Sequence, residues 1–239
     1  MDRLTRHQLK QDELRTTFEH YEQFIKERYK EVTAVVGLLI VVVGLAGGLK
    51  VYNDRREARA NALLGPALKT YHAYVGPPAP GTLGAEAETF PTAREKYMKA
   101  LEQFAELTRQ YPRTKAATIA RTHVGLCQAQ LGDAAAAIKT LQEAARDSDR
   151  NLASLAQFAL AGEWARSGKL AEAAKIYQDL ADHSISTVPR ATALLALADS
   201  YRATQPARAR QIYEQLEKDL GADVSLAQAV KQLISSLPK

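Results

Sequence analysis

The most pronounced hydrophobic feature of the chain is an uncharged stretch from Val32 to Leu49, bounded by Glu31 and Lys50. At a rise of about 1.5 Å per residue, a helix of this length crosses most of a hydrocarbon core roughly 30 Å thick. Polar and aromatic residues at its end, such as Lys50, can extend its reach into the interface. The pattern therefore predicts a transmembrane helix over residues 32–51.

Two other readings of this stretch are a cleaved signal peptide and a buried core helix. A signal peptide has a short basic front and an apolar core of about 7 to 15 residues. Here the 31 preceding residues carry seven acidic and seven basic side chains, and the apolar core is longer. A buried helix of a globular domain is usually amphipathic, whereas this one is apolar all round. Both comparisons favour an uncleaved anchor.

Three glycines, Gly37, Gly44 and Gly48, fall on one face of the predicted anchor, and the last two have the GxxxG spacing. Small residues at this spacing allow a partner helix to approach closely, so we predict a membrane helix contact here. Glycine is also frequent in membrane helices without such a partner, and that alternative stays open.

The segments on either side of the anchor also have helical patterns. Residues 1–31 form a short, charged, amphipathic tail, in which Leu14, Phe18, Tyr21 and Ile25 lie along one helical stripe.

After the anchor, residues 52–75 predict a helical extension that the Gly65-Pro66 pair kinks or breaks. Residues 76–90 contain several prolines and glycines and predict a loop. No segment has a convincing strand pattern.

From Pro91 onward the sequence repeats itself at a step of 36 or 37 residues. Each repeat has a small residue, a bulky residue four positions later and an apolar residue three positions after that. These positions are Ala100, Phe104 and Leu107; Ala137, Leu141 and Ala144; Ala173, Tyr177 and Leu180; and Ala209, Tyr213 and Leu216. The spacing places all three on one helical face. A repeat of this length is typical of a solenoid of helix pairs.

The repeat resembles the tetratricopeptide repeat. In that family the second helix reads Ala-x3-Phe-x2-Ala-x4-Pro, and Ala100, Phe104 and Pro112 match it, with Leu107 where alanine is usual. Each of the next two repeats has a glycine at the turn between its helices, whereas the last has a shorter turn with Pro206 opening its second helix. The step of 36 or 37 exceeds the usual 34.

The expected fold is all-α: a single transmembrane helix followed by an α-solenoid of tetratricopeptide-like helix pairs over residues 91–221. Residues 222–239 would form a C-terminal capping helix. The first matched helix also needs an antiparallel partner, and residues 52–75 are the candidate.

The resemblance implies a concave, partner-binding groove made by the first helix of each pair. The family's groove positions fall on Thr122, Leu126, Phe158, Arg166, Leu195, Asp199 and Arg202. Apolar side chains there could seat a partner, and the arginines could hold a carboxylate. Alternatively, these residues only pack against neighbouring helices, or the terminal helix fills the groove.

The sequence gives no sign of a cofactor, a metal site or catalysis. No two histidines lie within a helical turn of each other. Cys127, the single cysteine, lies among apolar residues and is expected to be an inert buried thiol. Carboxylates such as Glu163 and Glu172 lie on different helices, and we expect no apolar surroundings that would shift their pKa.

The net charge of +5 is spread over mixed surfaces, without the basic, aromatic-rich strip typical of nucleic-acid binding. The sequence therefore predicts a protein-binding module at the lipid bilayer rather than an enzyme.

The layout of tail, span and repeats resembles the single-span ancillary subunits of the bacterial Sec translocon. The resemblance implies an inner-membrane protein with its N-terminus in the cytoplasm and its repeats in the periplasm. Its implied partners are the translocon, periplasmic chaperones and emerging client polypeptides. Charge alone does not decide the orientation, since four basic residues flank the span on one side and five on the other. A cell-envelope scaffold, or an adaptor for a division, wall-synthesis or protease complex, is the alternative.

Overall fold

The computed structural model describes residues 28–76, 88–185, 187–220 and 224–237. The chain divides into two compact units, Met1–Arg55 and Arg56–Lys239, and each is described by itself. The amphipathic stripe expected in the tail lies outside the described residues.

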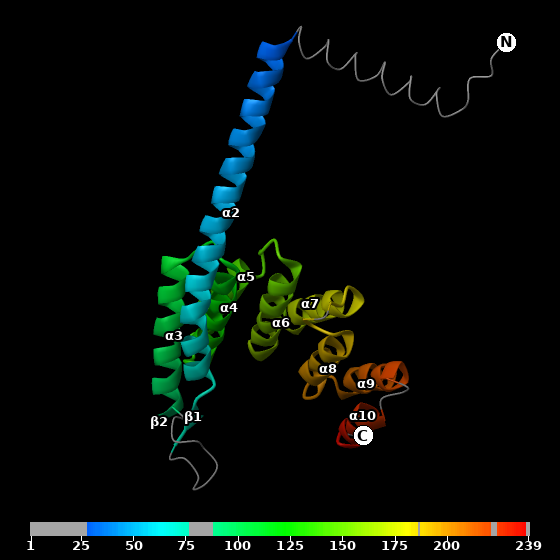
Figure 1. Cartoon of the computed structure of the whole chain (residues 1–239). Coiled ribbons are helices and arrows are strands. Elements are labelled where there is room, and N and C mark those ends of the chain that lie inside the picture. The colour runs from blue at the N-terminus through cyan, green and yellow to red at the C-terminus, as the bar shows by residue number, and fades with distance from the viewer. Residues whose placement is uncertain (1–27, 77–87, 186, 221–223, 238–239) are drawn as a thin grey trace, which may run out of the picture. The chain divides into compact units, whose positions relative to one another are not determined.

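Helix α2 (Tyr29–Tyr71) contributes to both units (Figure 1). Its most apolar eighteen residues have a mean hydropathy of 2.6, and none of them is buried. Among the described residues, α2 is the one helix long and apolar enough to cross a membrane.

The expected break at Gly65-Pro66 is wrong, because α2 continues through Pro66 to Tyr71. Pro66 is exposed, and so is Ala62, whose carbonyl loses its usual helical partner when proline occupies the fourth position after it. Water can satisfy that carbonyl. Burial of the Leu64 and Ala67 side chains, one on each side of the Gly65-Pro66 pair, stabilises the continuous helix.

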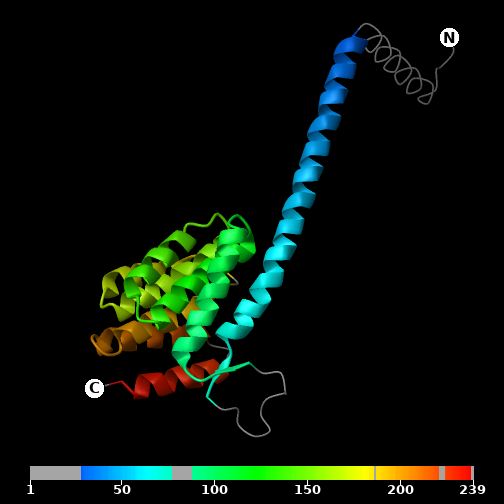
Figure 2. The same cartoon turned by 90° about the vertical axis from the view of Figure 1, so that its left-hand side faces the viewer.

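Helices fill nearly all of the second unit. After α2 they are α3 (Ala93–Gln110), α4 (Lys115–Gln130), α5 (Ala134–Ala144), α6 (Arg150–Arg166), α7 (Leu170–Asp182), α8 (Arg190–Tyr201), α9 (Pro206–Leu220) and α10 (Val224–Ser235). Each packs mainly against the next, and first helices of successive pairs also touch, α4 with α6 and α6 with α8. Figures 1 and 2 show this stack, which confirms the all-α solenoid.

The expectation that no strand forms is wrong in one place. Strands β1 (Tyr74–Val75) and β2 (Thr89–Phe90) pair in parallel at the two ends of the predicted loop. Each strand has only two residues, which is too short for an alternating pattern of polar and apolar residues, so the periodicity of the sequence could not predict these strands.

The repeat positions form the core of the helix pairs. All twelve of the small, bulky and apolar residues that define the repeat are buried, with exposed fractions from 0 to 5%. Gly125 on α4 brings this helix so close to α5 that an added Cβ would lie 2.6 Å from Leu141 Cγ. Ala161 and Ala198, at the corresponding places on α6 and α8, are also fully buried.

Two of the turns inside the pairs depend on glycine. Gly132 and Gly168 have φ values of +89° and +78°, which side chains disfavour. The N–H after each glycine donates to a carbonyl five residues back, from Asp133 to Gln128 and from Lys169 to Trp164. This pattern closes a helix end in a Schellman motif. The last pair lacks such a glycine, and Pro206 begins α9 as expected.

The carboxyl part of α2 is the expected partner of the first repeat helix. Ala60, Leu64 and Ala67 are buried in one cluster with Phe104 of α3 and Cys127 of α4. A second cluster begins at Ala161 and reaches Val230 and Leu237, where α10 covers the last apolar face.

The Glu57 carboxylate joins α2 to the start of α4. Its two oxygens accept hydrogen bonds from the backbone N–H groups of Lys115 and Ala116, each at 2.9 Å. The next amide, Ala117 N–H, donates to the Thr114 hydroxyl at 3.1 Å. Three of the four N–H groups that a helix start leaves unpaired are therefore satisfied.

Candidate functional site

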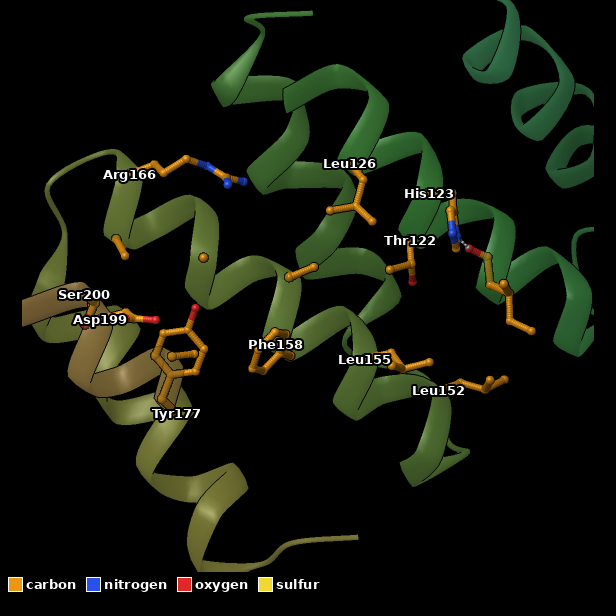
Figure 3. Close-up of a pocket in the computed structure, with 15 residues that line it drawn as sticks. Thr122, His123, Leu126, Leu152, Leu155, Phe158, Arg166, Tyr177, Asp199 and Ser200 are labelled. Carbon is orange, nitrogen blue, oxygen red and sulfur yellow. Dashed lines mark hydrogen bonds between the residues drawn. The ribbon is translucent and has the colours of Figure 1, made fainter. Parts of the chain in front are cut away.

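A pocket of about 640 Å³ opens along the first helices of three successive pairs. Its walls are mainly apolar, with Leu126 from α4 and Leu155, Phe158 and Ala159 from α6. The third wall comes from α8, where Ala196 and Ser200 line it (Figure 3). This is the face on which the sequence predicts a groove.

Five of the seven predicted groove residues line the pocket: Thr122, Leu126, Phe158, Arg166 and Asp199. The other two lie elsewhere. Leu195 is half-buried and packs against the second core cluster. Arg202 pairs with Asp199 at 3.6 Å and donates to the Ser236 hydroxyl just beyond α10. The predicted set is therefore mostly, but not wholly, one site.

The terminal helix does not occupy this pocket. Among the described residues, the pocket is lined by α4, α6, α7 and α8, and no residue of α10 lines it. Helix α10 packs instead on α9. The groove between α4 and α8 is thus open to a ligand.

Tyr177 is a pocket residue that the sequence assigns only to the repeat core. Its side chain comes from the second helix of a pair, α7, and its ring packs edge-on against Phe158 with centroids 5.4 Å apart. Although Tyr177 is only 4% exposed, its hydroxyl reaches the pocket between α6 and α8. Burial raises its pKa, so the phenol keeps its proton at neutral pH.

His123 also lines the pocket and was not predicted as a groove residue. Its ring contacts the rings of both Tyr71 and Phe104, at centroid distances of 5.1 and 4.9 Å. The Nδ1 atom lies 3.0 Å from the Ile119 carbonyl, which fits a donating N–H on that nitrogen. Burial lowers the pKa of His123, so the neutral ring is favoured.

Cys127 is not a chemical site. It is fully buried, and burial raises the pKa of its thiol to about 12, which keeps it protonated. The predicted burial of the thiol is confirmed.

The statement that Glu163 lies outside apolar surroundings is wrong, because this residue is only 3% exposed. It forms an ion pair with Arg166, one turn later on α6. The sequence did not reveal its burial because an acid and an arginine three apart are also typical of a solvated helix face.

A search of the described residues for three or more His, Cys, Asp or Glu side chains that could hold a metal ion finds no group. In the first unit, an added Cβ at Gly37, Gly44 or Gly48 would meet nothing within 4 Å. No described residue therefore covers that side of α2.

The family model of the tetratricopeptide repeat matches residues 192–219, which cover most of α8 and α9. No match was found among curated proteins. The match and the consecutive helix pairs together support a tetratricopeptide-repeat protein. Repeats of this kind form a non-catalytic fold that offers an extended concave surface to protein partners.

Proposed function

We propose that this chain is a membrane-anchored protein-interaction module whose groove, between α4 and α8, binds polypeptide segments. The observation that carries the proposal is the open, mainly apolar pocket on the first helices of three pairs. A pocket of this kind can take a bulky apolar side chain of a partner, which is the usual centre of a protein interface.

The apolar part of α2 is the proposed anchor, with the glycine face of Gly37, Gly44 and Gly48 available to another membrane helix. We further propose that the repeats face the periplasm and that the module assists the Sec translocon and periplasmic chaperones in handing over emerging clients. This finer assignment rests on the resemblance in layout. An activity reporter fused after Lys239 tests it, because cytoplasmic reporter activity would contradict the periplasmic placement.

The groove is tested by cross-linking from the full chain in its own membrane. A photoreactive residue at Leu126, which lines the pocket, should cross-link to polypeptide partners. Leu155→Asp should strongly reduce these cross-links, since it places a charge on the pocket wall at a residue already 39% exposed. Met98→Asp is the matched control, because Met98 is also exposed but lies on α3 outside the pocket.

The set of cross-linked proteins separates the two functional readings. Many different secreted chains would support client handover, whereas one stoichiometric partner would support a cell-envelope scaffold. If Leu155→Asp and Met98→Asp both leave cross-linking unchanged, the groove is not the binding site.

A further inference from the structure

Two neighbouring repeats carry the same trio of polar residues, an acid, an arginine three positions later and a tyrosine eleven positions after that. The trio is Glu163, Arg166 and Tyr177 in one repeat and Asp199, Arg202 and Tyr213 in the next. In both repeats the acid pairs with its arginine. The two tyrosines, in contrast, differ in their hydrogen bonding.

Tyr213 has its partner inside the fold. Its ring is fully buried, and its hydroxyl donates to Asp199 Oδ1. Burial and this acid raise the pKa of Tyr213 well above its usual value, as expected for a phenol that gives its proton to a carboxylate. The hydroxyl of Tyr213 therefore belongs to the architecture of the last pair.

Tyr177 has no such partner. Among the residues that the structure describes, its hydroxyl makes no hydrogen bond, although the side chain is only 4% exposed. The hydroxyl oxygen is nevertheless not one of the enclosed polar atoms without a partner, so the pocket leaves it accessible to a ligand. Here the hydroxyl lies at the pocket, which Asp199 also lines, and Figure 3 shows it pointing toward α6.

The neighbours of this hydroxyl leave room for a ligand. Gly162 of α6 has no side chain to cover the phenolic oxygen, and even an added Cβ there would lie 3.5 Å from it, without a clash. Asp199 uses Oδ1 for Tyr213, and within the described chain its Oδ2 accepts no hydrogen bond. One donor and one acceptor thus face the pocket together, next to the apolar wall of Phe158.

We propose that Tyr177 and Asp199 hold the main chain of a bound polypeptide, with the Tyr177 hydroxyl donating to a peptide carbonyl and the Asp199 carboxylate accepting a peptide N–H. The occupant is a segment with a bulky apolar side chain, which enters the pocket against Leu126 and Phe158. This inference rests on the proposed function of the groove. Contacts to the main chain do not read sequence, so the site selects for an apolar side chain and accepts many different segments.

The test uses the full chain in mild detergent and the fluorescently labelled peptide acetyl-Ser-Ala-Phe-Ala-Ser-amide, with Asp in place of Phe as the negative peptide. Tyr177→Phe removes only the hydroxyl and keeps the ring against Phe158. We expect it to weaken binding of the Phe peptide about 3- to 10-fold, the usual effect of one lost hydrogen bond. The denaturation midpoint should stay within error, because no internal hydrogen bond is lost.

Tyr213→Phe is the matched control at the equivalent position of the next repeat. It should lower the denaturation midpoint, which Tyr177→Phe leaves unchanged, because it removes an internal hydrogen bond. If Tyr177→Phe binds the peptide as the wild type does, or destabilises the chain as much as Tyr213→Phe, the proposal is overturned.

Leu155→Asp separates this inference from the proposed function. Loss of peptide binding in Leu155→Asp with full binding in Tyr177→Phe would reject the role of the hydroxyl and keep the groove. Unchanged binding in Leu155→Asp would reject the groove, and the inference with it. Equal binding of the Phe and Asp peptides, or no binding of either, would also overturn it.

Discussion

Gly125 on α4 offers the sharpest test of how the helix pairs pack. An alanine Cβ there would lie 2.6 Å from Leu141 Cγ, 2.9 Å from Leu141 Cδ2 and 3.3 Å from the Ala137 carbonyl oxygen. Carbon atoms in contact normally lie about 3.5 to 4.0 Å apart, so α4 and α5 must separate or Leu141 must leave its place. Leu141 is fully buried and has little freedom to do so.

Two opposing effects set the size of the change. Alanine in place of glycine inside a helix gains about 1 kcal/mol from the backbone. Overpacking of a close-packed core costs about 1 to 3 kcal/mol. Because the overlap is close to 1 Å and involves a buried side chain, we expect the upper part of that range and a net loss of roughly 1 to 2 kcal/mol for Gly125→Ala.

Trp164, the only tryptophan, lies on α6 and allows the measurement. Urea denaturation of the full chain in mild detergent, followed by its fluorescence, gives the free energy of unfolding. Gly162→Ala is the control, since its Cβ would meet only the Tyr177 hydroxyl at 3.5 Å, and stability should stay equal or rise. Equal stabilities for the two variants would refute the reasoning.

A second background checks the cause. Leu141→Ala removes the two atoms that an alanine Cβ at position 125 would approach most closely, Leu141 Cγ and Cδ2. In that background the added methyl should cost much less, and a double-mutant cycle measures the coupling. Additive effects of the two substitutions would show that the clash is not the reason for the loss.

Three further predictions concern the second unit. Glu57→Ala should lower the free energy of unfolding by about 1 to 2 kcal/mol, because two N–H groups of α4 lose a charged acceptor. The exposed control Glu214→Ala should change it by less than about 0.5 kcal/mol, and equal losses of the two variants in urea denaturation would contradict the capping role of Glu57. Burial lowers the pKa of His123, so the unfolded chain binds the proton more readily than the folded chain, and the free energy of unfolding should fall as the pH drops below about 6.5. His123→Leu should make the free energy of unfolding depend less on pH in this range. An unchanged pH dependence in the variant would exclude His123 as its source. Because burial raises the pKa of the Cys127 thiol to about 12, iodoacetamide at pH 7.5 should alkylate it slowly in the native chain and far faster in urea; equal rates would contradict its burial.

The repeat was predictable because its signal is periodic and local. A small, a bulky and an apolar residue recur at a fixed step, and all twelve are buried. The same register places five of the seven residues predicted for the groove at the pocket, and their role in binding stays a prediction. Glycine at the turns, Gly132 and Gly168, followed from their place between two helical patterns.

The missed features depend on contacts between distant residues. Pro66 marks a break in a single helix, but here it lies on an exposed face, and its neighbours Leu64 and Ala67 pack against other helices. The Glu57 cap joins residues 58 positions apart. Tyr177 and Tyr213 are alike in the sequence, but among the described residues only the Tyr213 hydroxyl has a hydrogen-bond partner, Asp199.

The division of the second unit into two apolar clusters has a consequence for its cooperativity. One cluster extends from α2 to α4 and the other begins on α6, so the boundary between the clusters falls between α4 and α6. The pocket crosses this boundary, since Leu126 lies on one side and Phe158, Tyr177 and Ala196 on the other. A polypeptide bound in the pocket would contact both sides of this boundary. Its free energy of binding would stabilise only the state in which both clusters are folded. Binding and the joint melting of the two halves are thereby thermodynamically linked.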